Sequence, residues 1–154
     1  CTLLSLEDTL LPDGTLNIHP TDKAPVAQAL VNAAISNYYI KNGDYSGLAP
    51  EYSGPLYDNV TVNGNTATVT FNHTAEGLML TSGNVASEFE VRDSDGSWKT
   101  AKATVDGTSV ILTADVSEIT GVRIGYRNKP SINLYNTING QRGYCASPFV
   151  WTAD

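Results

Sequence analysis

Residues 60–71 read VTVNGNTATVTF, two runs of alternating apolar and polar residues on either side of Asn63-Gly64-Asn65. Alternation with a period of two places the apolar side chains on one face of a strand. Asn-Gly accepts the positive φ angles that a tight hairpin turn requires. The stretch therefore predicts an antiparallel hairpin with one face in a hydrophobic core.

The same pattern continues toward the C-terminus. Asp-Gly turns at residues 95–96 and 106–107 separate short apolar segments, and we expect strands at residues 88–91, 98–103, 104–105, 110–112 and 122–126. Short strands every eight to twelve residues or so are typical of an antiparallel β-sandwich or jelly roll. We expect such a domain over residues 42–154.

Residues 1–41 follow a different pattern. CTLLSL at residues 1–6 reads as a buried strand, and a helix is predicted over residues 22–40, with Thr21 or Asp22 as its cap and Pro25 in its first turn. Its apolar face is Ala-rich, which indicates close packing against another element; the face comprises Val26, Ala29, Leu30, Ala33 and Tyr38. With the Gly-rich segment 42–50 as a boundary, residues 1–41 are expected to be a strand and helix from a separate α/β layer.

Composition excludes several function classes. The chain has 154 residues and a formal net charge of -7, and its nine Lys and Arg residues form no cluster, which argues against a nucleic-acid partner. No stretch approaches the roughly 18 consecutive apolar residues of a membrane span. Because the chain starts at Cys1 rather than Met, we expect it to be an internal piece of a longer precursor.

Two features indicate an oxidising compartment. Asn59-Val60-Thr61 and Asn72-His73-Thr74 are sequons, so Asn59 and Asn72 are predicted glycosylation sites. Cys1 and Cys145 are disulfide candidates that pair with each other or with a segment outside this chain, or remain buried thiols. With the acidic composition, these features predict a secreted or lysosomal protein.

Four motifs, in order, resemble the C-terminal part of sialate O-acetylesterases and their bacterial carbohydrate-esterase relatives. The resemblance covers about residues 3–152. It rests on IHPTDK at 18–23, YSGPLY at 52–57, the aromatic and Asp-Gly pattern of 89–126, and NLYN at 133–136 with SPF at 147–149. Each motif is weak alone, but their joint order and spacing are specific.

The resemblance implies an SGNH-type hydrolase that releases acetate from O-acetylated sialic acids. In that family a serine early in the sequence is the nucleophile, and the histidine of the IHPTDK motif, here His19, is the general base. Residues 43–47 (GDYSG) follow the histidine motif instead of opening the catalytic layer, so we interpret them as a turn. The resemblance therefore implies a partner, the N-terminal portion of the same precursor, and an acetylated sialoglycan substrate, with no cofactor and no metal.

The residue that orients His19 is left open. Pro20 disfavours a helical conformation at His19 and keeps the imidazole on a loop. The family commonly places an Asp two or three residues before the histidine, where this chain has Asn17 and Leu16. The orienting group is then Asn17, a backbone carbonyl, or a loop carboxylate such as Asp13, Asp8 or Glu7.

Other readings remain open from the sequence. One alternative is an acetyl esterase that acts on another polysaccharide such as xylan. The other is a non-catalytic carbohydrate-binding β module. His73, inside a sequon, is expected on the exposed surface with no role. Trp98 and Trp151 could stack on sugars but are expected in the core.

Overall fold

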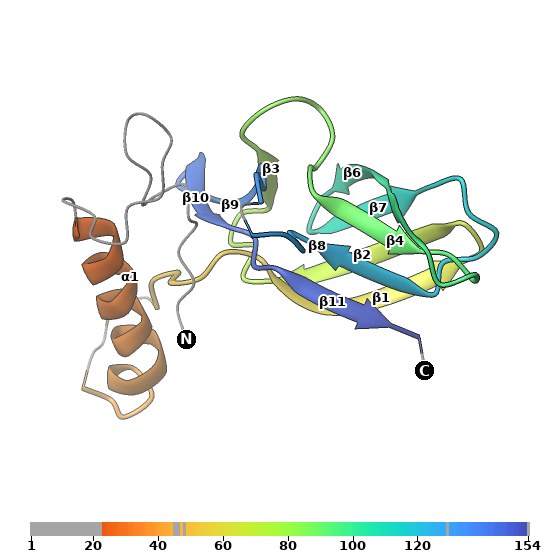
Figure 1. Ribbon diagram of the computed structural model, residues 1–154. Coiled ribbons are helices and arrows are strands. Elements are labelled where there is room, and N and C mark those ends of the chain that lie inside the picture. Colours follow the sequence, from red (N-terminus) through yellow and green to blue (C-terminus); the bar gives the residue numbers. More distant parts are fainter. Residues whose placement is uncertain (1–22, 45–46, 48, 129, 154) are drawn as a thin grey trace.

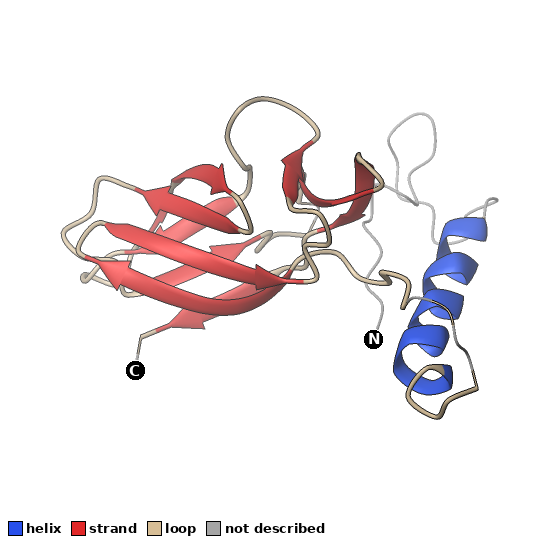
Figure 2. Cartoon of the chain, turned by 180° about the vertical axis from the view of Figure 1, so that it is seen from behind, coloured by secondary structure: helices blue, strands red, loops and turns tan. Residues whose placement is uncertain are grey.

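The computed structural model describes residues 23–44, 47, 49–128 and 130–153, and places a helical segment beside a β-rich body (Figure 1). The strand expected at residues 1–6 lies outside these ranges. In the described part, eleven strands form three antiparallel sheets. The same separation of helix and strands is visible from behind (Figure 2). A β-rich fold with one short helical segment is therefore confirmed.

The helical segment consists of α1 (Ala24–Ala34), which continues directly into the π-helical turn η2 (Ile35–Tyr39). Pro25 lies in the first turn as expected, and the position before the helix is Lys23, which provides no side-chain cap. The expected caps, Thr21 and Asp22, lie outside the described residues. None of the helices in the described ranges is long and apolar enough to span a bilayer.

The predicted apolar face of this helix is only partly covered. Ala29 is buried, but Leu30 is 57% exposed and Tyr38 is 61% exposed. Side chains of this kind lose favourable burial energy when they face water. The described elements therefore leave part of the helix surface available for another element.

Two four-stranded sheets pack face to face as a sandwich. The first has the order β1 (Leu56–Asn63), β2 (Thr66–Asn72), β7 (Ser109–Thr113) and β6 (Lys102–Asp106). The second has the order β11 (Phe149–Thr152), β8 (Gly121–Ile124), β4 (Phe89–Arg92) and β5 (Trp98–Thr100). A smaller sheet, β10 (Gln141–Cys145), β9 (Leu134–Ile138) and β3 (Leu78–Leu80), lies between the sandwich and α1 (Figure 1).

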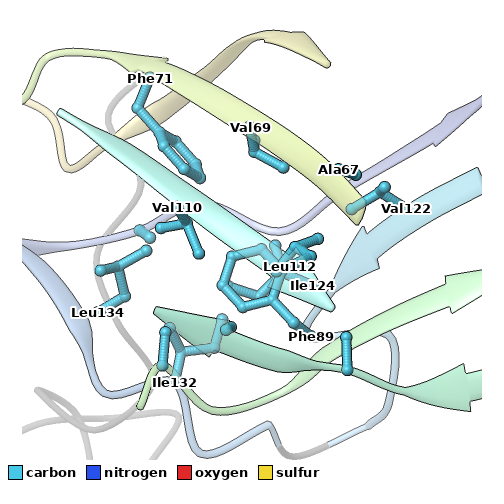
Figure 3. Packing of buried hydrophobic residues seen from close by; sticks show 14 of the residues in the cluster. Ala67, Val69, Phe71, Phe89, Val110, Leu112, Val122, Ile124, Ile132 and Leu134 are labelled. Atoms are coloured by element: carbon cyan, nitrogen blue, oxygen red, sulfur yellow. The ribbon is translucent and has the colours of Figure 1, made fainter. Parts of the chain in front are cut away.

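The hairpin that the sequence predicts is β1 and β2. Asn63 pairs with Thr66, which leaves Gly64 and Asn65 as a two-residue loop. Gly64 has a φ of 61°, and a glycine with positive φ at the first loop position matches the right-handed twist of the flanking strands. Ala67, Val69 and Phe71 alternate into the core, as the period of two requires (Figure 3).

Side chains from both sheets meet in one hydrophobic core. Phe89 and Ile124 of one sheet lie opposite Val110 and Leu112 of the other (Figure 3). Burying a Val, Leu, Ile or Phe side chain contributes about 1.5–3 kcal/mol. This core holds the sandwich together without help from α1.

The expected single strand at residues 98–103 is wrong. It divides at Ala101 into β5 and β6, which belong to different sheets. The Ala101 N–H donates to Phe89 O at 3.0 Å, beyond the last ladder pair of β4 and β5. Because residues 104–105 continue β6, the predicted separate strand there is also wrong. Apolar and polar residues keep alternating where the chain passes from one sheet to the other, so the sequence pattern could not show the break between β5 and β6.

Asp93, just after β4, ties three segments together. Its Oδ2 accepts from Lys99 Nζ at 2.9 Å, and its Oδ1 accepts from the backbone N–H groups of Ser94 at 2.7 Å and Ser117 at 3.1 Å. The hydrogen bond from Lys99 is the main cause that lowers the pKa of Asp93 from 3.8 to about 2. The carboxylate is therefore bound in its ionised form.

The depressed pKa of Asp93 predicts acid sensitivity. Its stabilising contribution is fully present above the unfolded-state pKa of about 4 and is lost as the pH falls toward about 2, because the unfolded chain binds that proton first. Urea unfolding at a series of pH values measures the effect. Asp93→Asn should flatten the slope of stability between about pH 4 and 2 relative to wild type, and an unchanged slope would contradict the assignment.

Candidate functional site

The residues predicted to perform catalysis are His19, Asp13 and Asn17, and all three lie outside the described residues. The same holds for Cys1. Their roles stay predictions, and the described structure begins at Lys23, directly before α1. The candidate site is therefore assembled from residues that lie between this helix and the β-sandwich.

A polar cavity of about 580 Å³ lies at this junction. It is lined by α1, the segment before β1, and the β9–β10 hairpin, through Asn32, Pro50, Glu51, Ile138, Asn139, Gln141, Arg142, Gly143 and Tyr144. Amide, carboxylate, guanidinium and phenol groups can exchange hydrogen bonds with a polar ligand. The cavity therefore provides the chemistry of a polar ligand site rather than of an apolar one.

Beside the cavity, Glu51 and His73 form a close pair. The Glu51 Oε1 atom lies 2.9 Å from His73 Nδ1 and also accepts from the backbone N–H groups of Tyr52 and Ser53. The Tyr52 ring packs edge-on against the imidazole with centroids 5.1 Å apart. The expectation that His73 lies on the exposed surface is wrong, because its side chain is only 27% exposed and is paired with Glu51, a contact that sequence spacing did not show.

A histidine held by a carboxylate is the arrangement that orients a general base. In this case the nearest serine in sequence to Glu51, Ser53, is buried and donates to Gly54 O at 3.0 Å. Ser53 is thus not presented as a nucleophile. We interpret the Glu51–His73 pair as a structural element of the cavity wall.

Asn136 of β9 holds the backbone of this cavity wall in place through its side-chain amide. Its side chain is fully buried, and its Nδ2 donates to Ser53 O at 2.9 Å and to His73 O at 2.8 Å. Its Oδ1 accepts from Tyr144 N at 2.7 Å. His73 has a φ of 57°, a conformation that non-glycine residues adopt rarely and that needs such support. The NLYN motif contained Asn136, but the pattern did not reveal its role.

The predicted glycosylation sites lie on the surface of the β1–β2 hairpin. Asn59 and Asn72 are both exposed. Asn59 Nδ2 lies 3.5 Å from Thr61 Oγ1 within its own sequon, and Asn72 Nδ2 donates to Asp58 Oδ1 at 2.8 Å. Modification at either position remains a prediction.

Cys145, at the end of β10, is buried, and its Sγ lies 3.8 Å from Ile132 O. Because Cys1 lies outside the described residues, a bond between the two cysteines stays a prediction. Within the described ranges, no group of three or more His, Cys, Asp or Glu side chains is placed to hold a metal ion.

The two tryptophans differ in position. Trp151 of β11 packs against the core, as expected. Trp98 of β5 pairs with Arg92 on the opposite, outward face of its sheet, and the Arg123 guanidinium lies over its ring at 4.2 Å from the centroid. The expectation of a core position for Trp98 is therefore wrong.

No protein-family model and no curated protein matches the chain. Among solved structures, the chain is similar to a novel carbohydrate acetylesterase from Xanthomonas citri, with a TM-score of 0.72 and 27% sequence identity. The match covers 94% of this chain and 31% of that protein.

The chain is thus related in structure to part of a carbohydrate acetylesterase. It spans about a third of the length of the structure that it matches. The expected relation to carbohydrate esterases is confirmed at this level.

Proposed function

We propose that this chain is the C-terminal portion of a carbohydrate O-acetylesterase that releases acetate from O-acetylated sialic acids. The observation that carries the proposal is the structural match over 94% of the chain to part of a carbohydrate acetylesterase. The IHPTDK motif at residues 18–23 supports the esterase class independently, because it resembles the family's catalytic histidine motif. The sialate preference rests on the resemblance alone.

In the proposed reaction, His19 acts as general base for a serine on the N-terminal portion of the same precursor. The serine oxygen attacks the acetyl carbonyl as its proton passes to the imidazole. The bond between the acetyl carbon and the sugar oxygen then breaks, and the sugar oxygen takes that proton. His19 next deprotonates a water molecule that attacks the acyl-serine, the bond to the serine oxygen breaks and acetate leaves, and the serine oxygen takes the proton from the imidazolium. Asn17 or Asp13 would orient the imidazole.

The helix surface supports the proposed partner. Four large apolar side chains of α1 and η2 are exposed, those of Leu30, Val31, Tyr38 and Tyr39. Exposed apolar side chains in such a group mark a contact surface. We propose that the N-terminal portion covers them and completes the α/β layer.

The proposal predicts that catalysis requires both portions. The isolated chain should release no acetate from an O-acetylated sialoside, because it lacks the serine nucleophile of the proposed mechanism. The chain joined to, or mixed with, its N-terminal portion should release acetate, which an enzymatic acetate assay measures. Hydrolysis by the isolated chain, or none by the complete protein, would overturn the proposal.

A second substrate class has support of its own. The solved relative is described as a carbohydrate acetylesterase, without restriction to sialic acid. An acetylated polysaccharide such as xylan is therefore the alternative substrate. Comparing acetate release from acetylated xylan and from an acetylated sialoside distinguishes the two, and faster release from xylan would reject the sialate preference.

We also propose a secreted or lysosomal location. Exposure of Asn59 and Asn72 supports it, since a glycan needs an accessible side chain. The mass of protein from its native source, before and after enzymatic deglycosylation, tests this directly, and an unchanged mass would count against it.

A further inference from the structure

We propose that the outward face of the sheet β11-β8-β4-β5 binds a pyranose unit of the glycan, which stacks on Tyr126 beside Arg123. The proposal deepens the proposed function, on which the choice of a carbohydrate ligand rests. The site lies on the β-sandwich and is separate from the cavity at the helix junction.

Arg123 is the centre of this face. Its Nε donates to Glu90 Oε2 at 2.8 Å, across the β4–β8 ladder in which the two residues are paired. Its guanidinium carbon lies 4.2 Å from the Trp98 ring centroid and 4.4 Å from the Tyr126 ring centroid. A guanidinium fixed by a carboxylate and two rings loses little further freedom when it binds a ligand.

The backbone is adapted to this arrangement at two glycines. A Cβ on Gly121 would lie 3.1 Å from Trp98 Cη2 and 3.0 Å from Arg92 Cβ, so the missing side chain lets the indole lie close over β8. Gly125 follows β8 with a φ of 65°, which a side chain would strain, and leads directly into Tyr126. The side chains of Trp98, Arg123 and Tyr126 thus form a defined surface.

Tyr126 remains 64% exposed although its ring is held against Arg123. An exposed aromatic ring can stack on the apolar C–H face of a pyranose, while its phenol oxygen stays in water. Arg123 has further N–H donors beyond its bond to Glu90, and Glu90 is a hydrogen-bond acceptor. An apolar ring face next to fixed donors and acceptors matches a sugar, which is apolar on its ring faces and polar at its edge.

The charges next to Tyr126 are locally balanced. Arg123 is paired with Glu90, and Arg127 Nε lies 2.7 Å from Glu88 Oε2. The surface therefore lacks the excess positive charge that a polyanion requires. Neutral and singly charged sugars share the ring chemistry that the site recognises.

The position of the face suits a substrate-holding role. β11 ends at the C-terminus, on the side far from α1, and β8 runs antiparallel to it, so β8 ends toward α1 (Figure 1). Tyr126 lies two residues beyond that end of β8. A glycan held there would lie on the side of the sandwich that faces the proposed catalytic portion.

The test measures binding of xylohexaose and of sialyllactose to the 154-residue chain, by calorimetry or by tryptophan fluorescence. At least one of them should bind, and Tyr126→Ala should weaken that binding by at least about tenfold, while Tyr126→Phe retains it. Tyr38→Ala, which removes a ring of similar exposure on η2, should leave affinity unchanged.

The proposal would be overturned if neither sugar bound at millimolar concentration. It would also be overturned if Tyr126→Ala and wild type bound with equal affinity. The measurement involves no ester hydrolysis, so its failure leaves the proposed esterase function standing. Conversely, an inactive complete protein whose chain still binds sugar through Tyr126 would reject the esterase function alone. Thermal unfolding of each variant confirms that the fold is retained.

Discussion

Replacing His19 with alanine in the complete protein is expected to lower kcat by about 10²–10⁴-fold, because a positioned general base contributes that much to acyl transfer. Substrate binding should change little, since the imidazole acts on the nucleophile rather than on the sugar. Initial rates of acetate release at several substrate concentrations separate kcat from KM. This prediction has the largest effect on activity.

His73 is the matched control for His19. His73→Asn should leave kcat within about threefold of wild type, because Asn tolerates the positive φ at this position and the Glu51–His73 pair is a structural element. If loss of His73 abolished activity while loss of His19 did not, the assignment of the base would be wrong.

Asn136→Ala is expected to destabilise the protein by about 3 kcal/mol or more. The substitution removes the hydrogen-bond partner of Ser53 O, which is buried, and those of His73 O and Tyr144 N, which are partly buried. A buried group that is left unpaired costs about 1–3 kcal/mol, and the lost contacts of the side chain add to this. Urea unfolding measures the change in free energy.

Asn65→Ala serves as the control for Asn136, because Asn65 is exposed in the hairpin loop and its substitution should change stability by no more than about 0.5 kcal/mol. Equal stabilities of the two variants would show that the three hydrogen bonds of Asn136 do not hold the cavity wall.

The β-sandwich was predictable where local signals were strong. The hairpin of β1 and β2 follows from alternation and from Gly64, and Gly107, with a φ of 60°, marks the turn between β6 and β7 in the same way. Such signals depend on neighbouring residues only. They correctly predicted most of the two large sheets.

Features that depend on distant residues were not predictable. In the small sheet, Leu78 of β3 pairs with Asn136 of β9, far apart in sequence, and no local signal predicts that pairing. The β9–β10 hairpin of the same sheet does have a local signal, the Asn139-Gly140 turn, from which no strand was predicted. The passage of the chain from β5 to β6 keeps the alternating pattern while it changes the pairing partner. Residue patterns specify which face is buried but not which strand lies alongside.

The candidate site shows the same division. His19 was predictable because its motif consists of residues adjacent in the chain. The Glu51–His73 pair, in contrast, joins residues 22 positions apart. Likewise, Trp98 and Arg123 meet only because β5 and β8 both flank β4. Contacts of this kind need the fold.

The most direct test of the central claim is an experimental structure of the complete protein, chain and N-terminal portion together. The account predicts that the His19 Nε2 atom lies within about 2.6–3.2 Å of a serine Oγ supplied by that portion, the distance at which a base activates a nucleophile. A His19 ring that faces bulk solvent, far from any serine hydroxyl, would contradict it.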